Sequence, residues 1–230
     1  MTERPIFLPS ETRPFVFHKN VSFVWVAGLS RSQKQKRVRA FHAAAIEEKE
    51  MKILEVSSSS EVEIGVQLSA FNLKVSLLPE IATVEGVYQS SRVYRNFGPN
   101  PKWLHCTGKE IKKEINSLKK NGIIDKNESP KFFELNGEKW VIHPTDLFFN
   151  WVYMNGLWEL EQKNPGVFEE LLQYDAFTDI NFTPATGTNC QAKALAKYMG
   201  MKKSGLNFEE LFASPAVFAE KIHKISEYTI

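Results

Sequence analysis

Apolar residues recur along most of this chain at the spacing of an α-helix. Val38, Phe41 and Ala45, for example, fall on one helical face behind a Ser30 or Ser32 cap. The same periodicity, with Thr, Asp, Asn-Pro and Ser-Pro start signals, marks other segments. It predicts helices over residues 30–45, 83–96, 108–120, 146–162, 166–174 and 191–200, and two more that begin near 207 and 214.

Strand patterns are fewer and shorter. β-Branched and aromatic residues predict strands over residues 22–27, 52–56 and 64–68. Asn136-Gly137 stands between β-prone flanks, and this dipeptide favours the positive φ angles of a two-residue turn. A β-hairpin is therefore expected near residues 131–142.

Together the elements predict an α+β, mainly α-helical fold with a few short strands. A chain of 230 residues, 43% of them hydrophobic, is long enough to close one sizeable core. We expect one compact domain over residues 21–230. Residues 1–20, rich in proline and charge, are expected to form an N-terminal arm or an irregular edge.

Composition and residue spacing limit the kinds of partner and chemistry that the chain can have. The formal net charge of +2 favours neither a nucleic-acid nor a small-molecule partner. Cys106 and Cys190 lie far apart, and the histidines lack a helical ligand spacing, so we predict no disulfide framework and no metal. No signal peptide and no uncharged apolar run near ~18 residues is present, which predicts a cytoplasmic protein without a membrane partner.

A polar stripe follows Thr83. Glu85, Gln89 and Arg92 fall at i, i+4 and i+7, so a continuous helix places them on one face, while Tyr88 lies on another. A carboxylate can assist glycosidic cleavage, and a guanidinium suits a phosphate. Spacing alone leaves a solvated helix surface as the alternative.

Lysines gather on the segment 108–120, largely away from its apolar face. Such a cluster can attract nucleic-acid phosphates or can form an ordinary solvated surface. Basic residues also crowd the first turns of the segment 30–45, where they oppose the helix dipole. A bound anion there would compensate, although a solvated face is the alternative.

Several sequence blocks resemble the NADAR family, and they match its DarT-associated antitoxin branch best. They are Leu68-Ser-Ala-Phe-Asn-Leu, Val84-Glu-Gly-Val-Tyr-Gln-Ser-Ser-Arg, Trp140 ahead of the segment 149–157, and the segments 28–36, 171–184 and 189–192. The resemblance spans about residues 23–195.

The resemblance implies a compact NADAR/YbiA-like N-glycosidase that removes ADP-ribose from ADP-ribosylated guanine bases in DNA and so reverses a DarT-type toxin. The implied ligand or product is ADP-ribose, without a cofactor, and the implied partners are ADP-ribosylated DNA and a toxin encoded nearby. An antitoxin and a phage counter-defence protein fit the resemblance equally. The alternatives are an N-glycosidase on riboflavin-pathway intermediates, a hydrolase of ADP-ribose on protein or RNA, and a non-catalytic protein that binds ADP-ribose or the toxin.

The resemblance also assigns residues. Glu85 would be the essential carboxylate, Trp140 would lie beside the sugar, and Asp179 would supply a second acidic group. A hairpin tryptophan in the core is the alternative for Trp140. The expected substrate-binding residues are Ser69, Phe71, Asn72, Tyr88, Gln89, Arg92, Ser32, Gln33, Asn189 and Gln191.

The sequence departs from the family pattern at two places. Gly86-Val-Tyr stands where relatives usually have Cys-Ala-Phe, and Arg92 stands where they have lysine. Around Trp140 the usual acidic-Pro-Lys pattern becomes His143-Pro-Thr. These changes leave activity possible and bear on substrate selectivity.

Overall fold

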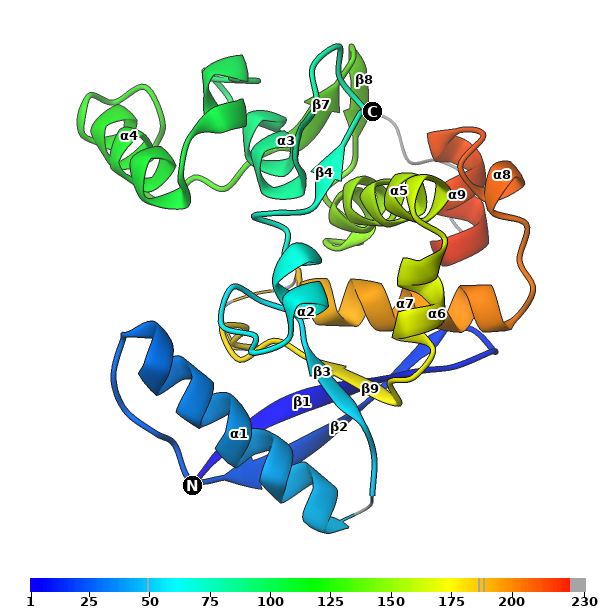
Figure 1. Ribbon diagram of the computed structural model, residues 1–230. Coiled ribbons are helices and arrows are strands. Elements are labelled where there is room, and N and C mark those ends of the chain that lie inside the picture. The colour runs from blue at the N-terminus through cyan, green and yellow to red at the C-terminus, as the bar shows by residue number, and fades with distance from the viewer. Residues whose placement is uncertain (49, 186, 188, 224–230) are drawn as a thin grey trace. The chain divides into compact units, whose positions relative to one another are not determined.

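The computed structural model describes residues 1–48, 50–185, 187 and 189–223, and the end of the predicted domain, 224–230, lies outside them. Helix outweighs strand, 44% to 17%, which confirms the α+β, mainly helical class. Contacts divide the chain into two units (Figure 1). Unit 1 combines residues 1–72 with 157–208, and unit 2 combines residues 73–156 with the described residues from 209 to 223.

Unit 1 contains a four-stranded sheet in the order β2-β1-β9-β3. Its strands are β1 (Thr2–Pro9), β2 (Val16–Phe23), β3 (Ile53–Glu55) and β9 (Ala176–Thr178). Strands β1 and β2 pair antiparallel over their full length, whereas β3 and β9 are parallel. The prediction that residues 1–20 form an arm or an irregular edge is therefore wrong. Pairing with β2 and β9, and burial of Ile6 and Phe7, hold this proline- and charge-rich segment in the sheet.

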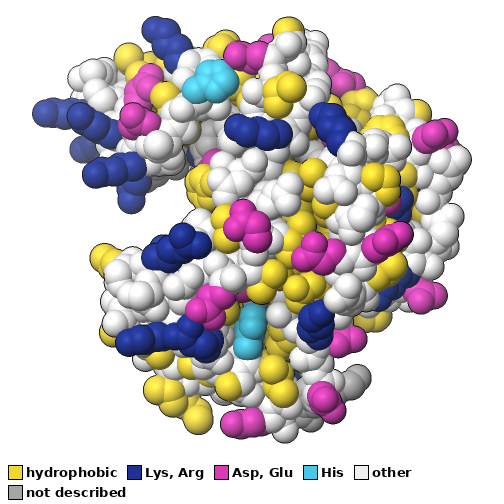
Figure 2. Space-filling model, viewed as in Figure 1, with side chains coloured by type: hydrophobic (Ala, Val, Ile, Leu, Met, Phe, Trp, Pro, Cys, Tyr) yellow, Lys and Arg dark blue, Asp and Glu magenta, His cyan; other side chains and the backbone are white. Residues whose placement is uncertain are grey.

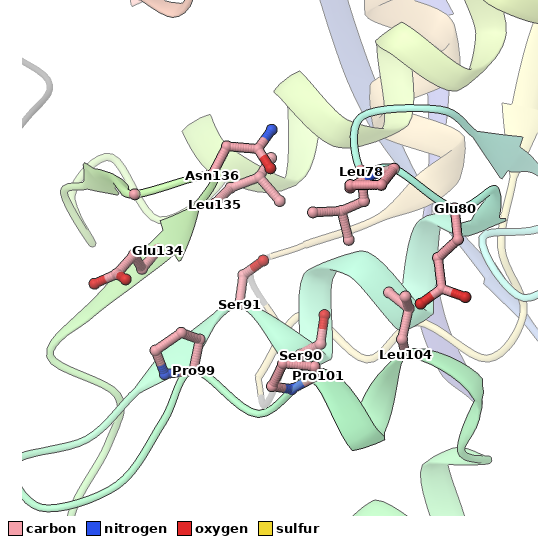
Figure 3. Close-up of a pocket in the computed structure, with 12 residues that line it drawn as sticks. Leu78, Glu80, Ser90, Ser91, Pro99, Pro101, Leu104, Glu134, Leu135 and Asn136 are labelled. Carbon is pink, nitrogen blue, oxygen red and sulfur yellow. The ribbon is translucent and has the colours of Figure 1, made fainter.

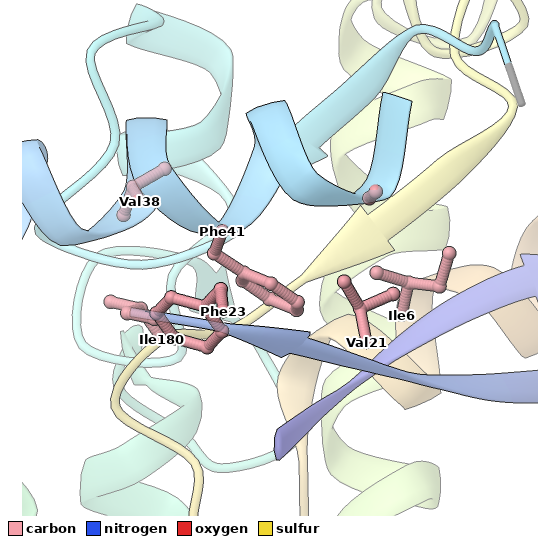
Figure 4. Close-up of a cluster of buried hydrophobic side chains, with 7 residues drawn as sticks. Ile6, Val21, Phe23, Val38, Phe41 and Ile180 are labelled. Carbon is pink, nitrogen blue, oxygen red and sulfur yellow. The ribbon is translucent and has the colours of Figure 1, made fainter. Parts of the chain in front are cut away.

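Helix α1 (Arg31–Glu48) covers this sheet. Ser30 accepts a hydrogen bond from the Gln33 amide, which confirms the predicted cap. Figure 4 shows Val38 and Phe41 of α1 meeting side chains of the first two strands and Ile180. The core cluster is Ile6, Val21, Phe23, Val38, Phe41, Ala45 and Ile180. Strand β2 ends at Phe23, four residues before the predicted end.

The predicted strand 64–68 is wrong, because helix α2 (Glu63–Gln67) lies there. Its apolar residues alternate along the sequence, but Ile64 and Leu68 are the buried pair and lie one helical turn apart. A Cβ on Gly65 would lie 2.1 Å from the Glu55 carbonyl oxygen. Close packing of α2 on β3 therefore requires glycine here.

Two further helices of unit 1 are α6 (Gly166–Leu171) and α7 (Gln191–Lys203). Helix α7 packs on β1 and β9. Helix α7 begins where predicted but continues past Gly200. A Cβ on Gly200 would lie 2.2 Å from the Phe15 carbonyl oxygen, so this glycine serves a close approach rather than a helix end. The helix stops before Gly205, whose φ is +75°.

Unit 2 begins with the short pair β4 (Lys74–Val75) and β5 (Ala82–Thr83), followed by helix α3 (Val84–Ser90). A three-stranded sheet then joins β6 (Arg92–Val93), β7 (Phe132–Leu135) and β8 (Glu138–Trp140). Asn136 and Gly137 have φ angles of 53° and 79°, so the predicted hairpin is confirmed with the predicted turn.

The 3-10 helix η1 (Pro101–His105) and helix α4 (Gly108–Lys120) follow in unit 2. Thr107 and Glu110 form a reciprocal capping box, and Ile111 joins Trp103 and Ile124 in a small core. Helix α4 has the predicted bounds, because its caps and its apolar stripe are both local in sequence.

Helix α5 (Leu147–Lys163) belongs to both units: residues 147–156 are counted in unit 2 and residues 157–163 in unit 1. It is apolar almost all round and largely buried, as predicted. The short α8 (Phe208–Leu211) precedes α9 (Pro215–His223), whose Val217 amide donates to the Ser214 hydroxyl. In the described part of the chain, no helix has the length and apolar character needed to cross a membrane.

Candidate functional site

Helix α3 in unit 2 carries the principal candidate carboxylate, Glu85. Thr83 caps the helix by accepting a hydrogen bond from the Gly86 amide at 3.0 Å. Glu85 therefore lies in the first turn, near the positive end of the helix dipole. Val84 and Val87 are fully buried and fix this short helix in its unit.

Glu85 and Gln89 form a hydrogen-bonded pair on one side of α3. The Gln89 amide donates to Oε1 of Glu85 at 2.7 Å, and both residues are half-buried. The other carboxylate oxygen, Oε2, has no hydrogen bond to any described residue. The arrangement orients the carboxylate and leaves one oxygen available to a ligand.

Gly86 shows how the chain accommodates its departure from the family pattern. A Cβ at this position would lie 2.1 Å from the carbonyl oxygen of Leu104 in η1. The backbone of α3 and that of η1 thus approach too closely for a side chain. This packing brings η1 against the same turn of helix that holds Glu85.

Arg92 is not on the helix. The prediction of one helix over residues 83–96 is wrong, because α3 ends at Ser90 and Arg92 begins β6, opposite Phe133 of β7. The Ser90 and Ser91 hydroxyls both donate to the Val87 carbonyl, and Ser91 forms the C-cap. Only Glu85 and Gln89 of the predicted stripe therefore share a helical face.

The Arg92 guanidinium lies over an aromatic surface. Its central carbon is 5.1 Å from the ring centroid of Tyr88, which packs on Phe133 and Phe149. The buried Nε has no hydrogen-bond partner among the described residues. A partly buried cation without a carboxylate is a natural anion-binding group, since a phosphate can satisfy its planar fork of donors.

Trp140 lies within the core of unit 2. It is 1% exposed at the end of β8, and its ring contacts Phe148 and Trp151 at centroid distances of 5.3 and 5.4 Å. The packing is that of a core tryptophan, the alternative considered from the sequence. Its role beside a sugar stays a prediction.

Asp179 is the candidate acid of unit 1, directly after β9. The Asn181 amide donates to its Oδ1 at 3.0 Å. Burial raises the pKa of Asp179 to about 6, while hydrogen bonds from Asn181 and the Gln191 side chain, together with the charge of Lys34, lower it.

Gln191 ties this acid to two neighbouring segments. Its Oε1 accepts from the Ala70 amide and its Nε2 donates to the Val56 carbonyl, both at 2.7 Å. Gln191 is also the first residue of α7 and is 7% exposed. Gln191, predicted to bind substrate, is thus a buried amide that holds the Ser69–Asn72 loop near Asp179.

The Ser69–Asn72 loop itself presents different groups. Ser69 is fully buried, and its hydroxyl has no hydrogen-bond partner among the described residues. Phe71 is 55% exposed, whereas the Asn72 amide donates to the Val66 carbonyl at 2.8 Å. Ser69 therefore retains a free donor, and Phe71 offers an exposed ring.

The remaining predicted residues of unit 1 lie at helix starts. Ser32 is exposed in the first turn of α1, with its hydroxyl 3.1 Å from that of Ser30, and Gln33 is half-buried beside it. Asn189 is half-buried just before the N-cap of α7. Of the predicted set, unit 1 thus brings together Asp179, Gln191 and the loop at Ser69.

Sequence reasoning missed Glu55, the last residue of β3. It is 3% exposed, and burial together with the neighbouring negative charge of Asp179 raises its pKa to about 8. Ser57, Thr178 and the Ile180 amide all donate to its carboxyl group. A glutamate within the apolar run Ile53–Val56 was the available signal, because acids are rarely buried without a reason.

Each unit also contains a pocket that avoids the predicted residues. The pocket of unit 2 has a volume of about 460 Å³, and in Figure 3 the side chains of Leu78, Leu104 and Ser91 line it. The pocket of unit 1, about 470 Å³, is lined by Arg4, His18 and Phe182 among others. None of the predicted site residues lines either pocket.

Helix α4 presents a lysine surface, made of Lys109, Lys112, Lys113 and Lys120. At 100° per residue Lys109, Lys113 and Lys120 lie opposite the buried Ile111, and Lys112 lies to one side. All four are exposed, and Figure 2 shows dark-blue side chains gathered over this helix. Glu110 is used in the capping box, and Glu114 accepts from the Trp103 indole at 2.8 Å. No acid among the described residues pairs with the lysine surface. Lys119 instead donates to backbone carbonyls.

The fold and these groups describe an α+β protein with a polar site on a short helix and a separate basic helix. The family model of the DarT1-associated NADAR antitoxins matches residues 2–229. The chain belongs to that family, as the resemblance predicted. No curated protein matches the chain.

Proposed function

We propose that the protein is an ADP-ribosyl glycohydrolase that removes ADP-ribose from guanine bases in DNA and so reverses modification by a DarT-type toxin. The observation that carries the proposal is the Glu85–Gln89 pair, a half-buried carboxylate with one oriented and one available oxygen. Membership of the antitoxin family supports the direction of the reaction, removal of a toxin's modification.

Cleavage of the N-glycosidic bond builds positive charge on the anomeric carbon of the ribose. A carboxylate placed beside that carbon stabilises the charge, while water adds to the carbon and the base departs with a proton. The Gln89 amide holds Glu85 through Oε1, so Oε2 is the oxygen that meets the sugar or the water. The role of the carboxylate as acid, base or charge stabiliser is decided by the pH profile of the reaction.

Arg92 suits the diphosphate of ADP-ribose. Its guanidinium lacks a carboxylate partner among the described residues and stacks over Tyr88, which limits its rotamers. Two parallel hydrogen bonds to phosphate oxygens would satisfy it and would exceed what a lysine offers. The replacement of the family lysine by arginine therefore favours a tighter hold on the same group.

The lysine surface of α4 fits the DNA part of the substrate. Neutralisation of backbone phosphates gives sequence-independent affinity that falls with salt. Since the four side chains point away from the core of unit 2, they are available for this contact.

The test is incubation with ADP-ribosylated guanine DNA and detection of free ADP-ribose by mass spectrometry. Glu85→Gln should bind this DNA without cleaving it, because the amide keeps the shape and loses the charge. Glu134→Gln, a half-buried glutamate of the same unit, is the matched control and should cleave normally.

Full activity of Glu85→Gln would contradict the mechanism. Cleavage of phosphoribosylamino-pyrimidines in place of modified DNA would assign a riboflavin-pathway substrate. Binding of ADP-ribose without turnover by the wild-type protein would contradict the enzymatic proposal.

A further inference from the structure

Glu55 ends strand β3 in the interior of unit 1, where a carboxyl group needs strong partners. Oε1 accepts from the Ser57 hydroxyl at 2.6 Å and from the Ile180 amide at 2.9 Å. Oε2 accepts from the Thr178 hydroxyl at 2.7 Å. Three donors thus converge on a side chain that is 3% exposed.

Two of these donors flank Asp179 in the chain. Thr178 precedes it at the end of β9, and Ile180 follows it. Both neighbours are buried, and the Ile180 side chain belongs to the core cluster shown in Figure 4. One carboxyl group of Glu55 therefore binds the Thr178 hydroxyl before Asp179 and the Ile180 backbone amide after it.

His42 of α1 adds a further contact to Thr178. Its Nε2 lies 2.8 Å from the Thr178 hydroxyl oxygen, and burial lowers the pKa of His42 to about 4. The Thr178 hydroxyl lies between the His42 ring and the Glu55 carboxyl group, so it links α1 to β3 through β9.

Other groups hold the Asp179 carboxyl group itself. The Asn181 amide and the Gln191 side chain donate to its carboxylate, and Lys34 lowers its pKa from α1. The Ser69 hydroxyl, unpartnered among the described residues, belongs to the loop that Gln191 anchors. The Cys190 thiol also lies near this pair of acids, and its pKa is raised by burial and by both carboxylates.

We propose that Glu55 is the positioning residue of Asp179, because its two oxygens bind the residues on either side of Asp179 and so fix the direction of the Asp179 carboxyl group. The proposal rests on the proposed glycohydrolase function for its kinetic part only. An apolar residue at position 55 would be easier to bury but would leave the Thr178 hydroxyl and the Ile180 amide without an acceptor.

The first test is independent of activity. The sequence has four aspartates, so ¹³C labelling of aspartate side chains gives a spectrum in which Asp179→Asn identifies one signal. In the wild-type protein the Asp179 signal should show two inflections with pH, its own and a second when Glu55 ionises. Glu55→Gln should remove the second inflection and leave the chemical shift at low pH unchanged. Identical titration curves in the two proteins would overturn the proposal.

The second test is kinetic and uses release of ADP-ribose from modified DNA. Glu55→Ala should lower kcat about 100-fold with little change in KM, as expected for a misplaced group, and Glu55→Gln should restore most of it. In an Asp179→Asn background, Glu55→Ala should have no further effect. Glu63→Ala, an exposed acid on α2, is the control for loss of a carboxylate in unit 1.

These outcomes separate the two proposals. A wild-type protein without glycohydrolase activity would contradict the proposed function, and the titration of Asp179 would still decide the role of Glu55. An equal loss of kcat from Glu55→Ala in both backgrounds would overturn the positioning role. If Glu55→Ala does not fold, Thr178→Val takes its place, because it removes the hydroxyl on one side of Asp179 and keeps the side-chain volume.

Discussion

Replacement of Glu55 by glutamine should change how the stability of the folded protein depends on pH. The amide has the shape of the carboxylate: its oxygen can accept from Ser57 and Ile180, and its nitrogen can donate to Thr178. The Thr178 hydroxyl then donates to His42, which takes the Nδ1–H tautomer. The substitution thus removes an ionisable group and keeps the hydrogen bonds.

The magnitude follows from the raised pKa of Glu55, about 8 in the folded protein against 4.5 for an ordinary glutamate. Between these values the folded protein holds a proton that the unfolded chain releases, so stability is highest below pH 4.5 and falls as pH rises. At about 1.4 kcal/mol per pKa unit, ionisation of Glu55 costs about 3 kcal/mol by pH 7 and on the order of 5 kcal/mol above pH 8.

Two neighbouring groups, His42 and Asp179, also make the stability of the folded protein depend on pH. His42, with its pKa lowered to about 4, adds stability above pH 6.5 that is lost as pH falls toward 4. Asp179, with its pKa raised to about 6, adds stability below pH 3.8 that is lost as pH rises to 6. His42 titrates in both proteins, so the difference between Glu55→Gln and the wild-type protein reports the ionisation of Glu55 together with its electrostatic coupling to Asp179.

The assay is urea unfolding of both proteins at pH 5, 6, 7 and 8. The variant should exceed the wild-type protein by less than about 1 kcal/mol at pH 5 and by about 3 kcal/mol at pH 7, with a larger gain at pH 8. Glu11→Gln, an exposed acid of the same unit, should show no such trend. A difference that stays constant with pH, or a variant less stable at pH 8, would refute the reasoning.

Three further predictions concern unit 2. Gly86→Ala should lower stability by about 1–3 kcal/mol in thermal denaturation, since its Cβ would meet the Leu104 carbonyl at 2.1 Å; Gly108→Ala, with open space around it, should be neutral or slightly stabilising. Arg92→Gln should weaken ADP-ribose binding in calorimetry by about 10-fold or more, and Arg92→Lys by less; equal affinities would exclude a phosphate contact. Four lysine-to-glutamine changes should lower the salt slope of DNA binding by up to about 3.6, at ~0.9 per phosphate contact; an unchanged slope would leave a solvated face at Lys109, Lys112, Lys113 and Lys120.

The sequence by itself determined the elements whose signals are local. Helix α4 has a capping box at Thr107 and a stripe of isoleucine and leucine, and the hairpin has Asn136-Gly137 at its turn. The start of α9 follows from Ser214-Pro215. Such signals act within a few residues, so no distant segment alters them. The family blocks likewise placed Glu85 and Gln89 on one helix, where the structure joins them by a hydrogen bond.

Tertiary structure decided the elements whose partners are distant in sequence. Residues 2–9 become a strand because residues 16–23 and Phe177 pair with them, and Arg92 leaves the helix because β7 pairs with it. Likewise, Glu55 gains its place from Thr178 and Ile180, more than a hundred residues away. A pattern read along the chain cannot contain these pairings, because burial and hydrogen bonding depend on which segments fold together.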